Sequence, residues 1–102
     1  MKFVFDIDGT ICSIEKDYRK AKPIYENINI VNKLYKLGHT VWFYTGRGTG
    51  TGNRWSRITK KQLGTWGVKY HKILFQKPVA DFYIDDKAVN AADFFKNNDK
   101  DD

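Results

Sequence analysis

Cysteine, proline and methionine are scarce in this sequence, and long hydrophobic runs are absent. The 102 residues include one Cys, one Met and two Pro. Because Cys12 stands alone, it can form neither an internal disulfide nor a cysteine-rich metal site, so packing must stabilise the fold. The longest uncharged stretch, around residues 40–46, is far shorter than the roughly 20 apolar residues of a membrane-spanning helix. Residues 1–6 also reach a charged side chain too early for a signal peptide, and we expect a soluble, cytoplasmic protein.

Acidic residues are missing from residues 27–80, although this stretch carries ten of the 18 Lys and Arg residues. Its charge is therefore +10, and the rest of the chain, with 8 basic and 12 acidic residues, has a charge of −4, which gives the net +6. A long basic stretch favours an anionic partner such as a phosphate ester or a nucleic acid. Taken singly, most of these lysines are better explained as a solvated helix face.

Hydrophobic residues make up 41% of the chain and aromatic residues 16%, enough for the core of one small domain. We expect this domain to span residues 1–96 and residues 97–102 to form a flexible polar tail. Hydrophobic periodicity and glycine positions predict helices at 25–37, 54–66 and 88–96, and strands at 2–7, 40–45, 72–75 and 81–85. Residues 46–53 contain four of the eight glycines, which predicts a loop. The spacing of these glycines matches no nucleotide-binding motif.

This alternation predicts an α/β fold with an open, mainly parallel, Rossmann-like sheet in three layers, with helices on both faces. One connection is irregular for such a fold. Only residues 76–80 separate the last two predicted strands, whereas a parallel crossover normally takes a dozen or more residues. The strand at 72–75 is therefore expected to be very short or irregular.

Acidic residues follow the first and the last predicted strand. In an open parallel sheet the carboxyl ends of the strands meet at one edge, so Asp6, Asp8, Asp85 and Asp86 should converge there. Carboxylates that converge repel one another unless a cation lies between them, and an all-oxygen ligand set favours Mg²⁺. The sequence therefore predicts a magnesium site.

The same edge predicts phosphoryl-transfer chemistry. Asp6 is placed to attack phosphorus and form an aspartyl-phosphate, and Asp8 to act as general acid and base. Thr45 and the amides of Gly46 and Arg47 would bind phosphoryl oxygens, and Lys77 would offset the negative charge. Lys72 or Lys87 could take the place of Lys77. For Arg47 and Arg54, contact with substrate and solvated surface are equally good interpretations.

Four segments in order resemble the motifs of the haloacid-dehalogenase-like (HAD) superfamily: Phe5-Asp6-Ile7-Asp8-Gly9-Thr10, Tyr44-Thr45-Gly46-Arg47, Lys77-Pro78 and Ile84-Asp85-Asp86. The resemblance implies that Asp6 is the nucleophile and Asp8 the acid/base, and that Asp6, the main-chain carbonyl of Asp8, Asp85 and Asp86 hold Mg²⁺. It also implies phosphate-ester hydrolysis. Residues 55–86 are similar to small phosphatases found with capsule and surface-polysaccharide synthesis proteins.

The chain has no room for the cap domain that most members of this superfamily insert after the first motif or between the second and third. The active site should therefore be open, which suits large substrates or closure by another subunit. We expect a Mg²⁺-dependent phosphomonoester hydrolase acting on a sugar phosphate or similar metabolite, with no membrane partner. The alternatives are a polynucleotide end phosphatase, which the basic stretch would suit, and a phospho-accepting receiver-like signalling module.

Overall fold

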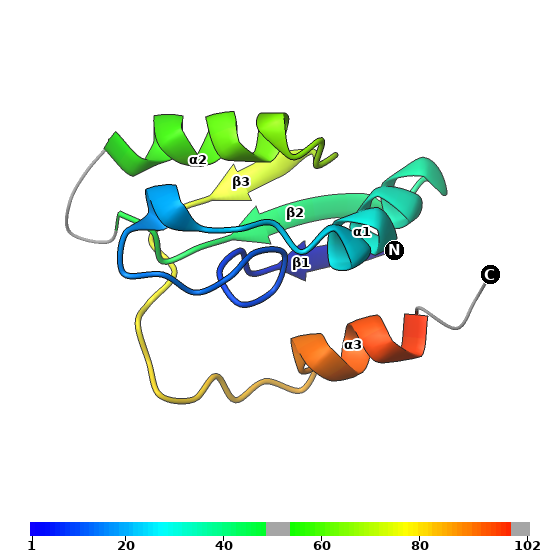
Figure 1. Cartoon of the computed structure of the whole chain (residues 1–102). Coiled ribbons are helices and arrows are strands. Elements are labelled where there is room, and N and C mark those ends of the chain that lie inside the picture. Colours follow the sequence, from blue (N-terminus) through cyan, green and yellow to red (C-terminus); the bar gives the residue numbers. More distant parts are fainter. Residues whose placement is uncertain (49–53, 99–102) are drawn as a thin grey trace.

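Residues 1–48 and 54–98 are described by a computed structural model of the chain, in which three parallel strands form one sheet. The strands are β1 (Lys2–Phe5), β2 (Thr40–Tyr44) and β3 (Lys72–Leu74), in the order β1-β2-β3. Phe5 pairs with Phe43, and Phe43 with Ile73. Figure 1 shows the three strands side by side and pointing the same way. The predicted α/β class and the parallel pairing are confirmed.

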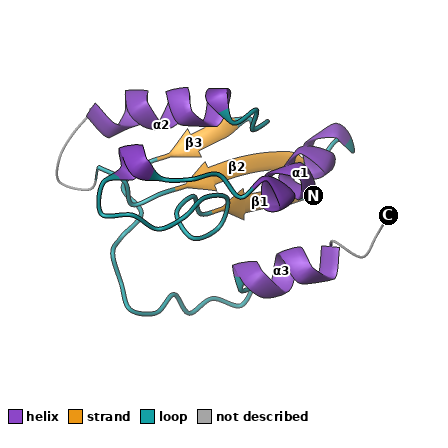
Figure 2. Ribbon diagram, viewed as in Figure 1, coloured by secondary structure: helices purple, strands orange, loops and turns teal. Residues whose placement is uncertain are grey.

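Among residues 1–48 and 54–98, three α-helices and one 3-10 helix accompany the sheet (Figure 2). They are the 3-10 helix Tyr18–Lys20, α1 (Tyr25–Lys36), α2 (Arg54–Thr65) and α3 (Ala91–Asn98). The predicted helices at 25–37 and 54–66 are confirmed almost to the residue. Gly38 ends α1 in the left-handed conformation, with φ of 94°, and its N–H donates to the carbonyl of Tyr35. The last helix begins three residues later than predicted and reaches into the predicted tail, of which residues 99–102 lie outside the described chain.

The core lies on one face of the sheet. Alternation along the strands turns Phe5, Val41 and Phe43 to this face, where they are buried. Helix side chains cover them, at the helical spacing Ile28, Val31 and Leu34 in α1, with Leu63 from α2 and Phe95 from α3. In α3 the Phe94 ring contacts both Phe3 and Phe5, while the Phe95 ring stacks against Phe5.

The opposite face differs from the sequence prediction. Val4, which alternates with Phe3 and Phe5, is 52% exposed, and no helix among the described residues packs on its side of the sheet. All three helices bury side chains in the same core, Ile28 from α1, Leu63 from α2 and Phe95 from α3, so none of them covers the opposite face. Helices on both faces are therefore not found in the part of the chain that the structure describes.

The fourth predicted strand is also absent from this structure. Residues 81–85 pair with no strand, and Figure 1 shows the segment between β3 and α3 looping away from the sheet. β-prone residues favour an extended backbone, but a strand also needs a partner within hydrogen-bonding distance. Within the described ranges, no helix is long and apolar enough to cross a lipid bilayer.

Candidate active site

Three predicted site residues meet at the carboxyl end of the sheet. Asp6 follows β1 directly, Thr45 follows β2, and Lys77 comes three residues after β3. The Lys77 Nζ atom lies 3.6 Å from Asp6 Oδ2, and the Lys77 N–H donates to the carbonyl of Thr45 at 2.9 Å. Thr45 in turn donates its N–H to the carbonyl of Leu74. Strands that are distant in sequence therefore place a carboxylate, a hydroxyl-bearing residue and an ammonium group together.

The Asp6 carboxylate is accessible. Its side chain is 39% exposed, and its Oδ1 atom accepts a hydrogen bond from the N–H of Ile7 at 2.8 Å. Lys77 approaches from the other side because Gln76 adopts a left-handed backbone conformation, with φ of 73°, that turns the chain at the end of β3. The Lys77 ammonium also lies 4.4 Å from the centre of the Tyr83 ring. Asp6 thus has one open side and one side that faces a positive charge.

Asp8 forms a two-pronged ion pair with Arg47. Arg47 Nη2 donates to Asp8 Oδ1 at 2.8 Å, and Arg47 Nε donates to Asp8 Oδ2 at 2.9 Å. After Asp8 the chain turns through Gly9, whose φ of 81° is a conformation that glycine adopts without strain. Both carboxylate oxygens of Asp8 therefore point to the guanidinium group.

Arg47 is completely buried, which the sequence did not indicate. Its remaining donors reach Thr59 Oγ1 at 3.2 Å, Gln62 Oε1 at 2.6 Å and the Cys12 sulfur at 3.7 Å, so all five N–H groups have a partner. The guanidinium carbon also lies 4.8 Å from the centre of the Tyr18 ring. A side chain held in this way is not available at the surface, and the two interpretations left open for Arg47, substrate contact and solvated surface, both differ from what is found.

Thr59 and Gln62 are site residues that the sequence reasoning missed. They lie one turn apart on α2, and both contact the same Arg47 nitrogen. The i, i+3 spacing of two polar residues on an otherwise amphipathic helix was the available signal, but it is common on solvated helices. The side chain of Arg54, and residues 49–53 of the glycine-rich loop, lie outside the described part of the chain, so their predicted roles stay predictions.

Thr45 itself is buried. Its hydroxyl oxygen accepts a hydrogen bond from the N–H of Arg47 at 3.1 Å, which closes the turn after β2. The turn keeps the backbone that follows β2 beside Asp6 and Lys77. Binding of phosphoryl oxygens by Thr45, Gly46 and Lys77 remains a prediction.

Asp85 and Asp86 lie apart from this group, fully exposed on the segment before α3. The N–H of Lys87 donates to Asp85 and lowers the pKa of that carboxyl, and a hydrogen bond with Asp86 lowers it further. The hydrogen bond to Asp85 and the repulsion of its charge raise the pKa of Asp86. Across residues 1–48 and 54–98, no three acidic, His or Cys side chains lie close enough to hold a metal ion. As placed here, the predicted Mg²⁺ ligands do not form a site.

Cys12 is fully buried in the core, next to the Asp8 side chain. Burial, followed by the charge of Asp8, raises the pKa of the Cys12 thiol from 9.0 to about 12. The thiol is therefore uncharged at neutral pH, which excludes it as a ready nucleophile.

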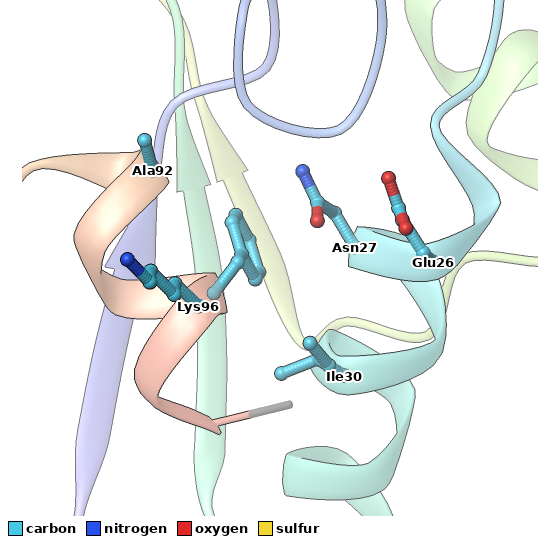
Figure 3. Close-up of a pocket in the computed structure, with 6 residues that line it drawn as sticks. Glu26, Asn27, Ile30, Ala92 and Lys96 are labelled. Carbon is cyan, nitrogen blue, oxygen red and sulfur yellow. The ribbon is translucent and has the colours of Figure 1, made fainter. Parts of the chain in front are cut away.

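A shallow hollow of about 200 Å³ lies between α1 and α3. Figure 3 shows Glu26, Asn27 and Ile30 on one side and Ala92 and Lys96 on the other. None of the residues that line it belongs to the predicted site. It is small and open, and it adds nothing to the chemistry at the sheet edge.

The sequence matches no protein-family model and no curated protein. Among solved structures, a structural genomics target from Vibrio cholerae is 31% identical, with a TM-score of 0.80 over 92% of this chain and 86% of that one. The chain belongs to the same family as this Vibrio cholerae protein. The likeness spans most of both chains, so the two proteins share the fold described above.

A second similar structure is a chain of the Pnkp1/Rnl/Hen1 complex. It is 18% identical, with a TM-score of 0.61 over 83% of this chain, and this chain spans only 30% of its length. At this identity the likeness concerns the fold alone.

Proposed function

We propose that the protein is a phosphomonoester hydrolase in which Asp6 is the nucleophile. The observation that supports it best is the 3.6 Å approach of the Lys77 ammonium to an accessible Asp6 carboxylate, beside the turn at Thr45. A carboxylate that attacks a phosphate ester needs such a cation, because nucleophile and substrate are both anionic. The resemblance of the four motifs to HAD phosphatases supports the same chemistry.

In the proposed reaction a carboxylate oxygen of Asp6 attacks phosphorus, and the bond between phosphorus and the ester oxygen breaks. The leaving oxygen takes up a proton and departs as the alcohol. A water molecule then attacks phosphorus, gives up a proton, and breaks the bond to Asp6, releasing inorganic phosphate and the free carboxylate. Lys77 offsets the charge that gathers on the transferring group in both steps.

Asp8 is the proposed group that handles these protons. Its ion pair with Arg47 orients the carboxylate that would accept a proton from water. To donate a proton to the leaving group, at least one Asp8 oxygen must leave the guanidinium. We therefore assign Arg47 as a positioning residue for Asp8 rather than as a phosphate ligand.

Mg²⁺ is proposed as the cofactor on the chemistry of the acids alone. Asp6, Asp8, Asp85 and Asp86 offer only oxygen donors, which suit this ion. In the arrangement described, Asp85 and Asp86 would have to move to join the first two acids.

The proposed substrate is a small phosphate monoester such as a sugar phosphate. A polynucleotide end is the second candidate, because residues 27–80 carry ten Lys and Arg residues and no acid, which would suit a nucleic-acid backbone. The exposed residues Arg57, Lys60 and Lys61 on α2 would supply contacts to a nucleic-acid backbone.

The test of the proposal is phosphate release from a panel of sugar phosphates, nucleotides and phosphorylated oligonucleotides in the presence of Mg²⁺. Asp6→Asn keeps the shape of the side chain but removes its charge, and we expect turnover to fall at least about a thousandfold. Asp93→Asn, an exposed acid on α3, is the matched control and should keep full activity. Equal turnover by wild type and Asp6→Asn would rule out this mechanism.

A further inference from the structure

We propose that Gln62 is a positioning residue of the candidate site, which holds Arg47 so that the Asp8 carboxylate takes up the same position in each turnover. The inference rests on the proposed function, in which Asp8 moves protons. It assigns a role to a side chain of α2 whose amide bonds to Arg47 and to the backbone of Tyr18. Three features of this contact support it.

The first feature is the use of both ends of the Gln62 amide. Its Oε1 atom accepts a hydrogen bond from Arg47 Nη1 at 2.6 Å, and its Nε2 atom donates one to the carbonyl of Tyr18 at 2.8 Å. Tyr18 begins the 3-10 helix that comes between β1 and α1, whereas Arg47 follows β2. A carboxylate of the same shape would lack the donor that the Tyr18 carbonyl needs. Gln62 therefore ties together two segments that leave different strands.

The second feature is the rigidity of the group that Gln62 holds. The N–H groups of a guanidinium lie in one plane and point in fixed directions. Gln62 at 2.6 Å and Thr59 at 3.2 Å hold the Nη1 atom of Arg47. Holding Nη1 also fixes the directions of Nη2 and Nε, which donate to Asp8 at 2.8 and 2.9 Å. The Tyr18 ring, 4.8 Å from the guanidinium carbon, covers one face of the plane.

The third feature is that the Gln62 contact carries no charge. In the proposed reaction one Asp8 oxygen has to leave the guanidinium to deliver a proton, and later has to return. The guanidinium stays charged throughout, so it needs other partners while Asp8 is away. Gln62 and Thr59 supply neutral acceptors that keep Arg47 in place and do not compete with the returning carboxylate. An acid at position 62 would compete, because hydrogen bonds between charged groups are stronger than neutral ones.

A displaced Arg47 would leave Asp8 without a fixed position, and proton delivery to the leaving oxygen would be the first step to slow. General acid catalysis contributes about a hundredfold or more to such a step. A misplacement of about 1 Å can cost up to about a hundredfold. The loss should be large for esters whose alcohol has to leave with a proton. It should be small for esters whose leaving group departs as a stable anion.

The test compares kcat/KM for benzyl phosphate, whose alcohol leaves with a proton, with kcat/KM for p-nitrophenyl phosphate, whose phenolate leaves without one, both with Mg²⁺. Gln62→Met keeps the length of the side chain and loses both hydrogen bonds. In this variant we expect the ratio of the benzyl to the nitrophenyl value to fall at least about tenfold. Gln62→Glu, which loses the donor and competes for Arg47, should show the same fall. Asp8→Asn gives the full size of the effect, and Thr65→Met, at an exposed position of α2, should keep the wild-type ratio.

Both esters are measured on one preparation, so a variant that is only partly folded lowers both values equally and leaves their ratio unchanged. A wild-type ratio in either Gln62 variant would overturn the inference and leave the proposed function standing. An equal fall of the ratio in Thr65→Met would overturn it as well, because the effect would then not depend on Gln62. If the wild type released phosphate from neither ester, the proposed function would fall and the inference with it.

Discussion

At the scale of single residues, the sequence predicted the meeting of Asp6, Thr45 and Lys77 but not the burial of Arg47. The first follows from topology, because parallel strands bring their carboxyl ends to one edge. The burial of Arg47 depends on two side chains of α2, Thr59 and Gln62. Both accept hydrogen bonds from the buried guanidinium. No local pattern around Arg47 encodes those distant partners.

The two-pronged ion pair between Arg47 and Asp8 gives the first prediction at this scale. Arg47→Lys keeps the charge but loses the paired donors, so we expect the free energy of unfolding to fall by about 3 kcal/mol. Urea unfolding measures the loss. Arg57→Lys, on the exposed side of α2, should change stability by less than about 0.5 kcal/mol. Equal stabilities for the two variants would show that the paired hydrogen bonds of Arg47 contribute nothing to the free energy of unfolding.

The buried thiol gives a second prediction. With the pKa of Cys12 near 12 rather than 9.0, we expect alkylation at pH 8 to be up to about a thousandfold slower in the native protein than in urea. Folding keeps a proton that the unfolded chain loses, so the free energy of unfolding should fall as pH rises from about 9 toward 12. Cys12→Ala should lack this part of the pH dependence. Native alkylation as fast as in urea would contradict the account.

At the scale of elements, periodicity predicted what local sequence controls. The helices at 25–37 and 54–66 were recognised by apolar positions at helical spacing, and the strands at 40–45 and 72–75 as short β-prone runs. Residues 81–85 have the same extended character, yet they are unpaired. Propensity describes the backbone that a segment prefers, whereas pairing also depends on whether the connection brings the segment beside a partner strand.

Phe95 and Phe82 compare a buried ring in a helix with an exposed ring in an unpaired segment. Phe95 of α3 is 5% exposed and stacks on Phe5, so Phe95→Ala should lower the free energy of unfolding by about 3 kcal/mol. Phe82→Ala should lower the free energy of unfolding by less than about 0.5 kcal/mol, because that ring is 81% exposed. Urea midpoints of the two variants give the comparison. A loss for Phe82→Ala as large as that for Phe95→Ala would contradict the exposure of residues 81–85.

At the scale of the whole molecule, the charge is divided between a basic middle and acidic flanks that carry all four predicted ligands. This division distinguishes the two substrate classes. A small phosphate monoester touches few charges, so its kcat/KM should change little between about 50 and 200 mM salt, whereas that of a phosphorylated oligonucleotide should fall steeply. Replacing Lys60 and Lys61 with Gln should flatten the oligonucleotide slope, while Lys96→Gln on α3 should not. A steep slope for sugar phosphates would contradict the assignment of a small substrate.

The central claim is that Asp6 carries the phosphoryl group. Acid quenching during turnover, followed by borohydride reduction and peptide mass analysis, traps an aspartyl-phosphate as homoserine at the modified position. We predict trapping at Asp6 in the wild type and in Asp93→Asn, and none in Asp6→Asn. Steady phosphate release by the wild type with no reduction at Asp6 would contradict the account.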